Sequence, residues 1–313
     1  MRQPKTSVAV PTLGRSPWLG RCLEALRRDG GDELEILVVA QGVELEARVA
    51  GLADRVLELP ANAGFARAVN LAFAAARGEL LATVNDDAVV DERWLAGLSQ
   101  ALAGRPDVAA VQGVQLSLED PERIDGGGLA WNRFWQAVQI GRGEPASSFA
   151  ARPPAEVFGV SATAALFRRQ ALAAVGGAER RAFDERLFAY YEDVDLAGRL
   201  RDAGYRALAV PAARARHAGS FTGRRLGSLH RRLIYGNRHL VLARLLGAAF
   251  WARWPRILLR DLADLRNALG RRDRAAAAGI AAGVGRALRR LPGFARRGKP
   301  LVPLAELRRF RTD

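Results

Sequence analysis

The chain has 313 residues, of which 49% are hydrophobic and 26% are charged. This composition excludes an intrinsically disordered protein, and the length suits one large domain or one domain with an appendage. The formal net charge of +15 is concentrated near the C-terminus: residues 224–313 hold 22 Lys and Arg against 5 Asp and Glu, whereas residues 1–223 hold 26 against 28. A uniformly basic protein is therefore excluded, and we expect a near-neutral domain with a basic appendage.

Several features of the sequence indicate a cytoplasmic protein. The single cysteine, Cys22, excludes a disulfide framework and favours a reducing compartment. The N-terminal segment MRQPKTSVAV lacks the long apolar core of a signal peptide. The longest uninterrupted apolar run near the C-terminus, residues 245–252, is far shorter than the roughly 20 residues that span a bilayer. We therefore expect no transmembrane helix.

Strand and helix patterns alternate through the N-terminal half of the chain. β-rich or continuous apolar runs predict strands at 6–12, 34–40, 55–60, 79–84 and 107–116. Helical spacing of apolar residues predicts helices at 17–28, 44–51, 64–78 and 91–104. Asp91 is the expected N-cap of the last of these helices. Alternation about every twenty residues is typical of an α/β fold with a mostly parallel sheet.

The second half of the chain is less regular. Residues 117–160 are rich in Gly and Pro, and a long irregular segment in a compact domain is often a functional loop. The later predicted elements are a strand at 160–169, a helix at 192–202, a strand at 205–211 and helices within 226–290. We therefore divide the chain into a main domain at 1–225 and a basic, amphipathic helical extension at 226–313.

Two groups of acidic residues are the strongest candidates for a functional site. The run NDD at 85–87 follows the strand at 79–84, and sheets of this type bind ligands beyond the carboxyl ends of their strands. Glu192 and Asp193 form the second group, with His217 downstream. Such hard oxygen ligands suit Mg²⁺ or Mn²⁺, which are often coordinated by the phosphates of a substrate as well. The alternative for NDD alone is a simple turn, which Asn and Asp favour.

The helix at 192–202 separates two of its acids. On a helix, Asp193 and Asp195 point about 200° apart, so both cannot face one cleft. Asp195 has Arg199 one turn later, which predicts an ordinary surface pair. Asp193 lies at the start of the helix, where a side chain can point into a cleft. We therefore assign Asp193 to chemistry and Asp195 to structure.

Five segments occur together in the order and spacing of a known family. They are VAVPTLGR, LPANAGFARAVNLAF, LLATVNDDAVVDERWL, GVSATAALFRRQAL and FDERLFAYYEDVDLAGRLRDAGYRALAVPAARARH, and they span about residues 6–240. In this combination the chain resembles family 2 glycosyltransferases, most of all the bacterial rhamnosyltransferase-like branch. The resemblance implies a GT-A (Rossmann-like) fold, a nucleotide-sugar donor, a divalent cation and inversion at the anomeric carbon.

The resemblance also implies roles for the acidic residues. By position, NDD corresponds to the DxD-type motif of the family, in which Asp87 would bind the metal. Asn85 or Asp86 would contact the ribose or the sugar of the donor. Asp193 matches the general base that takes the proton of the acceptor hydroxyl, and His217 matches a further metal ligand.

Other donor-binding positions follow from the resemblance, with one departure. The implied residues are Pro11, Thr12 and Arg15 on the first nucleotide-binding loop, and Asn62, Gly64 and Phe65 near the base and ribose. After the second strand the family usually has an Asp that reads the base, but VVAQGV places Ala40 there. Gln41 would then contact the pyrimidine edge. Asn85 is a second departure, because it makes the first member of the metal motif neutral.

The acceptor side is the least readable part of the sequence. Its candidate residues are Glu192, Trp131, Tyr191 and Arg238. The aromatic side chains would form a platform for the acceptor, with buried packing as the alternative. Arg238, in the segment YGNRH, would contact a phosphate or pair with an acid.

The C-terminal segment LVLARLLGAAFWARWPRILLRDL mixes apolar residues with arginines. Arg253, Arg256 and Arg260 fall on one side at helical spacing. Such a helix suits the anionic inner face of the cell membrane. The alternatives are packing against the main domain and contact with a second subunit in a homo-oligomer.

Together these features predict an inverting, metal-dependent glycosyltransferase with a role in cell-wall or polysaccharide synthesis. The expected donor is a dTDP- or UDP-sugar such as dTDP-rhamnose, and the expected acceptor is a glycan or a polyprenyl-linked sugar. A nucleotidyltransferase is the alternative among enzymes, although PTLGRSPW is a poor phosphate loop. A non-catalytic sugar-nucleotide binder and a nucleic-acid-binding protein are further alternatives, and no recognised motif supports specific nucleic-acid binding.

Overall fold

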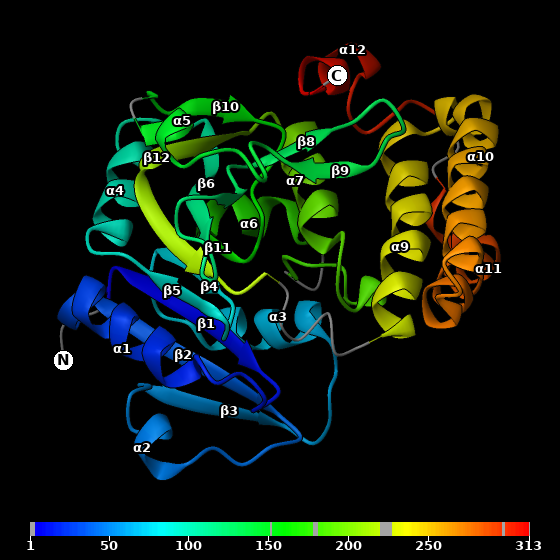
Figure 1. Cartoon of the computed structure of the whole chain (residues 1–313). Helices are drawn as coiled ribbons and strands as arrows, with labels where there is room; N and C mark the ends of the chain where they lie inside the picture. Colours follow the sequence, from blue (N-terminus) through cyan, green and yellow to red (C-terminus); the bar gives the residue numbers. More distant parts are fainter. Residues whose placement is uncertain (1–3, 151, 178–180, 220–226, 296–297, 313) are drawn as a thin grey trace.

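The fold is a large mixed β-sheet with helices on both faces and a helical C-terminal region packed against one side (Figure 1). A computed structural model of the chain describes residues 4–150, 152–177, 181–219, 227–295 and 298–312. Within these residues the sheet has the order β10-β12-β6-β11-β4-β1-β2-β3, with β5 beside β12 and β7 beside β6. A separate hairpin pairs β8 with β9.

Most strands of the N-terminal half pair in parallel, as predicted, except the short β5 and β7, which pair antiparallel with β12 and β6. The strands are β1 (Thr6–Thr12), β2 (Leu34–Gln41), β3 (Arg55–Leu59), β4 (Leu80–Val84), β5 (Ala88–Val90), β6 (Val108–Ser117), β7 (Ile124–Gly126), β8 (Leu129–Trp131), β9 (Ala137–Gln139), β10 (Ala155–Val157), β11 (Ala164–Arg168) and β12 (Arg206–His217). β1 pairs in parallel with β2 and β4, β2 with β3, and β6 with β12. β11 runs antiparallel between β4 and β6, which makes the complete sheet mixed.

The helices follow the predicted alternation closely. They are α1 (Leu19–Gly30), α2 (Ala47–Ala50), α3 (Phe65–Ala75), α4 (Trp94–Leu102), α5 (Ser147–Ala150), α6 (Arg169–Val175), α7 (Glu192–Asp202), α9 (Ser228–Leu246), α10 (Ala249–Gly270), α11 (Arg274–Phe294) and α12 (Leu304–Arg309), with short 3-10 turns η1 (Gly31–Glu33) and η2 (Glu185–Leu187). The predicted helix at 192–202 coincides with α7 at both ends. Residues 117–160, expected to be irregular, hold the short elements β7 to β10 and α5.

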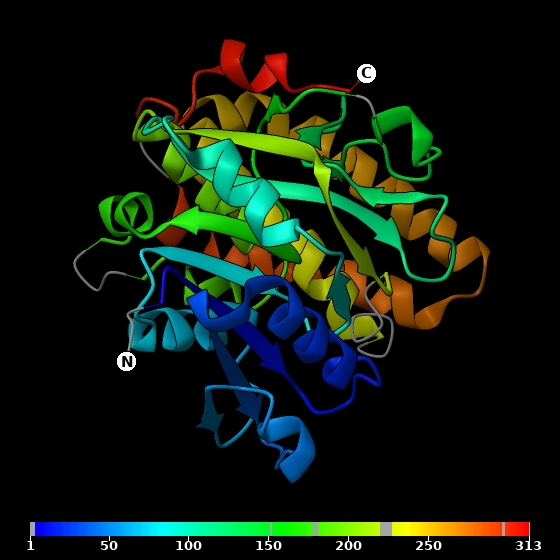
Figure 2. The same cartoon turned by 90° about the vertical axis from the view of Figure 1, so that its left-hand side faces the viewer.

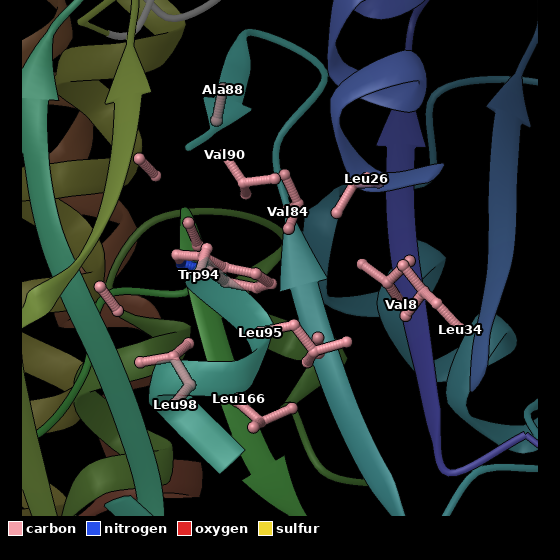
Figure 3. Packing of buried hydrophobic residues seen from close by; sticks show 14 of the residues in the cluster. Val8, Leu26, Leu34, Val84, Ala88, Val90, Trp94, Leu95, Leu98 and Leu166 are labelled. Atoms are coloured by element: carbon pink, nitrogen blue, oxygen red, sulfur yellow. The ribbon is translucent and has the colours of Figure 1, made fainter. Parts of the chain in front are cut away.

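Two apolar layers cover the two faces of the sheet. On one face, Leu26 of α1 and Trp94 and Leu98 of α4 are buried against Val8 and neighbouring strand residues (Figure 3). On the other face, α3, α6 and α7 supply a second cluster of buried side chains. Because both faces are covered, the central strands read as nearly continuous apolar runs in the sequence.

The strand directions bring five strand ends to one edge of the sheet. β1, β2 and β4 are parallel, and β6 has the same direction as β4 because the antiparallel β11 separates them. β12 is parallel to β6 and ends at His217. The antiparallel β11 begins at the same edge, where the carbonyl of Thr163 accepts a hydrogen bond from the Asn85 amide at 2.8 Å. This edge therefore holds the run NDD, which follows β4, and His217 at the end of β12.

The start of α4 differs from its prediction. The helix begins at Trp94, and its N-cap is Arg93, which has a positive φ of 64°. Asp91 does not cap it through its side chain, which lies 3.4 Å from a guanidinium nitrogen of Arg216. The Asp91 amide donates to the carbonyl of Arg214 in β12, so the sheet edge fixes this backbone before the helix starts.

The C-terminal helices share a core with the main domain. α9, α10 and α11 lie side by side next to α7 (Figures 1 and 2), and one apolar cluster joins them to β8, α7 and the loop before α7. Leu245 of α9 approaches Gly198 of α7 so closely that a Cβ at Gly198 would lie 2.0 Å from a Leu245 methyl. Packing against the main domain, one of the predicted alternatives, is therefore present.

The predicted domain boundary at 225/226 lies outside the described residues, so the division into two domains stays a prediction. Among the described helices, none combines the length and the apolar composition needed to cross a membrane.

Candidate functional site

A cleft of about 1100 Å³ opens at the edge of the sheet where the five strands end. It brings together most of the residues that the sequence singled out. The sequence-predicted residues that line it are Pro11, Thr12, Gln41, Asn62, Gly64, Phe65, Asn85, Asp86, Asp87, Tyr191, Glu192, Asp193, His217 and Arg238. Two predicted residues do not line it: Arg15 is exposed, and Trp131 is fully buried. Trp131 packs against Trp135 and Phe158 instead, so it is not part of an acceptor platform in this structure.

The run Asn85–Asp87 is a turn and also a wall of the cleft. The Thr12 hydroxyl donates to Asp86 Oδ2 at 2.6 Å, and the Ser16 hydroxyl donates to the Asp86 carbonyl at 2.7 Å. These contacts tie the turn to the loop after β1. Burial raises the pKa of Asp86 to about 7, and the neighbouring carboxylate of Asp87 adds to this. The run NDD is therefore a turn, and its three side chains also line the cleft.

Asp87 lies beside His217 in the wall of the cleft. Their closest side-chain atoms, Oδ1 and Nε2, are 3.4 Å apart. The other ring nitrogen of His217, Nδ1, lies 2.7 Å from Oδ2 of Asp125. Burial of His217 lowers its pKa, but the contacts with Asp125 and Asp87 outweigh burial and raise that pKa to about 9. Asp125, which the sequence analysis missed, orients the imidazole as carboxylates do beside metal-bound histidines.

The pair Asp87 and His217 fits a divalent cation that is completed by a substrate. Nε2 of His217 is buried and makes no hydrogen bond, and its neighbour Asp87 Oδ1 lies 3.4 Å away, so this nitrogen has capacity for a further polar partner. In the described residues, no group of three or more acidic, His or Cys side chains is arranged to hold an ion by itself. Mg²⁺ and Mn²⁺ commonly use one or two protein ligands and the phosphates of a substrate, and this donor set matches that pattern.

Asp193 lies in the first turn of α7 and points into the cleft. Its Oδ1 accepts a hydrogen bond from the Val194 amide at 2.8 Å. Burial nevertheless raises the pKa of Asp193 to about 6. The neighbouring Glu192 is buried as well, and its pKa is raised well above the usual value by burial and by Asp193. A carboxylate with a pKa near neutrality, facing a cleft, is suited to accept a proton.

The loop before α7 has an unusual backbone. Phe188, Tyr190 and Tyr191 have positive φ angles of 70°, 66° and 69°, and each such non-glycine residue costs about 1–3 kcal/mol. The side-chain amide of Asn237, in α9, donates to the carbonyls of Leu187, Ala189 and Tyr190 at 2.8–2.9 Å. Asn237 is completely buried. A side chain of the C-terminal helices therefore helps to fix the loop that positions Asp193.

The segment YGNRH contained this signal, although the sequence analysis attended to Arg238 in place of Asn237. Arg238 is buried and pairs with Asp261 of α10, which is the acid-pairing alternative. Asp195 is also buried, and it pairs with Arg199 at 2.8 Å and with Arg244 of α9. The predicted pair of Asp195 and Arg199 is therefore present, but the prediction that it lies at the surface is wrong, because α9 covers that side of α7.

The loop after β3 meets the loop before α7. Gln41 Oε1 accepts from the Ala63 amide at 3.1 Å, and Asn62 Oδ1 accepts from the Gly64 amide at 3.0 Å. Gly64 precedes α3 and has a φ of 89°. A Cβ at Gly64 would lie 2.5 Å from the carbonyl oxygen of Phe188. Only glycine allows this close approach between the two loops.

The sheet order and the flanking helices define a GT-A fold, which two solved structures confirm. The mannosyltransferase PcManGT from Pyrobaculum calidifontis, solved with GDP-Man and Mn²⁺, aligns with a TM-score of 0.55 and 19% identity, over 92% of this chain and 88% of that chain. GalNAc-T7, solved with UDP, GalNAc and Mn²⁺, aligns with a TM-score of 0.55 and 14% identity, over 76% of this chain and 51% of that chain.

The model of the family described as glycosyl transferase family 2 matches residues 7–176, which is more than half of the sequence. The chain belongs to this family, and the predicted resemblance is confirmed. The chain is also 34% identical over 199 residues to N-acetylglucosaminyl-diphospho-decaprenol L-rhamnosyltransferase from two strains of Mycobacterium tuberculosis, CDC 1551 / Oshkosh and ATCC 25618 / H37Rv. That match covers 54% of this chain and 61% of the relative, less than two thirds of its length.

Replacing Gly64 with alanine tests the contact between the two loops. We expect Gly64→Ala to lower the free energy of unfolding by at least about 2 kcal/mol, because a strained φ and a clash with Phe188 act together. Gly104→Ala is the matched control, since Gly104 has a φ of 68° but nothing lies within 4 Å of its added Cβ. Urea unfolding of both variants gives the comparison. Equal losses would contradict a tight contact at Gly64.

Proposed function

We propose that the chain is an inverting, metal-dependent glycosyltransferase that transfers a sugar from a nucleotide-sugar donor to a glycan or a polyprenyl-linked acceptor. The observation that carries the proposal is that one cleft holds both Asp193 and the pair Asp87 and His217. Membership of family 2 supports transfer with inversion. The similarity to an L-rhamnosyltransferase supports rhamnose, from a dTDP-linked donor, as the transferred sugar.

In the proposed reaction, Asp193 acts as the general base. The oxygen of an acceptor hydroxyl forms a bond to the anomeric carbon of the donor, and the bond from that carbon to the diphosphate breaks on the opposite side. The proton of the hydroxyl moves to the Asp193 carboxylate, and the nucleoside diphosphate leaves. The raised pKa of Asp193 makes its carboxylate more basic than an exposed one, which favours this proton transfer.

Asp87 and His217 would hold the divalent cation. When it is bound, the cation supplies positive charge that stabilises the diphosphate leaving group. Asp125 keeps the His217 ring oriented through its contact with Nδ1. Asp86, which accepts a hydrogen bond from Thr12 and lines the cleft, would contact the ribose or sugar of the donor.

The donor base is expected near Gln41. Because Gln41 Oε1 accepts from the Ala63 amide, its NH₂ group is the end that can donate to a carbonyl of a pyrimidine. Uracil and thymine both carry such carbonyls. Asn62, Gly64 and Phe65 line the same part of the cleft and would contact the ribose and base.

The rival functions differ in what they require of this cleft. A nucleotidyltransferase would transfer a nucleotidyl group and leave pyrophosphate as its product. A non-catalytic binder would bind the donor, and replacing Asp193 would then have no measurable effect on turnover. Nothing recognised in the sequence supports specific binding of nucleic acid.

We further propose that the protein binds peripherally to the inner face of the cell membrane through α10. An exposed stripe on this helix, at positions three or four residues apart, combines apolar residues with arginine. Its members are Trp251, Pro255, Leu259, Leu262, Arg266 and Leu269, with exposed Arg256 beside them. An anionic bilayer matches this combination. Of the three arginines that the sequence placed on one basic side, Arg260 pairs with Asp264 instead.

Nucleotide binding is the first test of the proposal. We expect dTDP or UDP, but not GDP, to raise the melting temperature in the presence of Mn²⁺, with most of the shift lost in EDTA. A ligand at 100 times its Kd stabilises by about 2.7 kcal/mol. Asp87→Ala and His217→Ala should lose the metal-dependent part of the shift. Asp107→Ala, at the opposite end of β6, should keep it. No shift with any nucleotide would contradict the proposal.

The second test concerns the protonation of Asp193. Because a protonated carboxyl cannot accept a proton, we expect kcat/KM to be constant well above pH 6 and to fall about tenfold per pH unit well below it. Asp193→Asn should lower kcat by about 100- to 10,000-fold and keep the thermal shift with nucleotide. Asp202→Asn, at the exposed end of the same helix, should stay within about twofold of wild type. Unchanged turnover of Asp193→Asn would favour a non-catalytic binder.

Vesicle binding tests the membrane proposal. Leu259→Glu combined with Leu262→Glu should weaken binding to vesicles that contain phosphatidylglycerol by at least about tenfold, since both apolar contact and charge become unfavourable. Gln100→Glu combined with Ala103→Glu makes the same change in net charge near the end of α4 and should have little effect. Equal binding of both double variants would contradict α10 as the contact surface.

A further inference from the structure

A second cavity, of about 690 Å³, lies between η2, α9 and α11. Its wall contains five arginines and an acidic residue, namely Arg186, Arg232, Arg286, Arg289, Arg290 and Glu185. We call this cavity the arginine pocket. It is not part of the site described above, although Phe188 lines both the pocket and the cleft. Arg231 lines the cleft and its neighbour Arg232 lines the pocket, so the two cavities adjoin along α9.

The positive charge of the pocket is not balanced by the acids beside it. Glu185 already lies 3.2 Å from Arg181, and Asp184 forms an ion pair with Arg186 at 2.6 Å. In the part of the chain that the structure describes, neither Arg232 nor Arg289 has an acidic partner or a hydrogen bond. Several guanidinium groups therefore face one another without enough carboxylate to offset them.

One backbone carbonyl, that of Arg186, brings two guanidinium groups of the pocket together. Arg286 and Arg290, one turn apart on α11, both donate to the carbonyl of Arg186, at 2.9 Å and 3.1 Å. Burial lowers the pKa of Arg286 to about 10, and the positive charges of Arg290 and Arg232 add to this effect. An anion in the pocket would relieve this repulsion between like charges.

The arrangement fits a diphosphate better than a single carboxylate. Guanidinium groups bind phosphate oxygens through two parallel hydrogen bonds, and several of them can surround a group with two or more negative charges. Leu229, Leu233 and Phe294 add an apolar part to the wall, which suits a ligand that carries a hydrocarbon chain next to its charged group.

We propose that the arginine pocket binds the diphosphate of a polyprenyl-diphosphate-linked acceptor while the sugar of that acceptor lies in the cleft near Asp193. The inference rests on the proposed function, which places a sugar hydroxyl next to Asp193. It adds the class of acceptor, because a free glycan has no diphosphate to place in the pocket. Arg232 and Arg289 are the residues we assign to the anion, since they are exposed and have no acid of their own in the described structure.

Binding of inorganic pyrophosphate in EDTA, measured by titration calorimetry at fixed ionic strength, tests the pocket without any need for turnover. We expect Arg232→Gln combined with Arg289→Gln to raise the Kd at least about tenfold, because two charge-assisted contacts are lost. Arg271→Gln combined with Arg274→Gln removes the same charge from the exposed junction of α10 and α11 and should change the Kd less than about twofold. Asp87→Asn should still bind pyrophosphate, which separates the pocket from the proposed metal site.

Kinetics then identify the ligand. The Arg232→Gln/Arg289→Gln variant should show a KM at least tenfold higher for a diphosphate-linked lipid acceptor and an unchanged KM for a simple glycoside of the same sugar. Equal pyrophosphate affinity in this variant and in wild type would overturn the proposal.

If the Arg232→Gln/Arg289→Gln variant keeps the wild-type KM for the diphosphate-linked acceptor but binds phosphatidylglycerol vesicles at least about tenfold more weakly, the proposal is overturned in favour of a phospholipid headgroup. If the proposed transfer reaction fails altogether, the calorimetry still reports on the pocket, so the two failures remain distinguishable.

Discussion

The common direction of β1, β2, β4, β6 and β12 is the constraint on which the arrangement of the cleft depends. Each strand ends at the same edge of the sheet, so Thr12, Asp87 and His217 meet although they are far apart in the sequence. The register of β12 is fixed on both sides, because His217 pairs with Ala88 of β5 and with Ser117 of β6. A slip by one residue would turn the imidazole to the other face of the sheet.

The same convergence concentrates negative charge in a partly buried place. Burial raises the pKa of Asp86, of Glu192 and of Asp193, so each of these carboxylates is less stable ionised here than in water. His217 lies among these acids, with Nε2 at 3.4 Å from Asp87 and Nδ1 at 2.7 Å from Asp125, and its ring must be neutral at Nε2 to bind a metal. A site of this kind is destabilised by itself and gains stability from a bound cation, which is the physical basis of the metal dependence we propose.

The C-terminal helices take part in the architecture of the site. α9 supplies Asn237, which holds the strained loop before α7, and Arg244, which pairs with the buried Asp195. Arg286 of α11 hydrogen-bonds Asn237 in turn and also faces the arginine pocket. The acidic cleft and the basic pocket thus meet on the two sides of one loop, and the helices that carry the excess positive charge are the ones that fix that loop.

The sequence alone determined the family, the α/β alternation and the order of the main strands and helices up to α7. Strand and helix periodicity and short polar runs at strand ends are local signals. The sequence also indicated Asp87 and Asp193 as candidates, since one follows and the other starts a predicted element, and the family resemblance added His217. It did not determine the antiparallel insertion of β11, because strand direction depends on pairing partners that are remote in sequence.

Tertiary structure alone decided that Trp131 is buried, because a local pattern does not distinguish a buried tryptophan from an exposed one. It also decided that Asp195 is buried, because α9 covers that side of α7. It also decided the roles of Asp125 and Asn237. Their contacts join elements 92 and about 50 residues apart, and no local pattern records contacts at such separations.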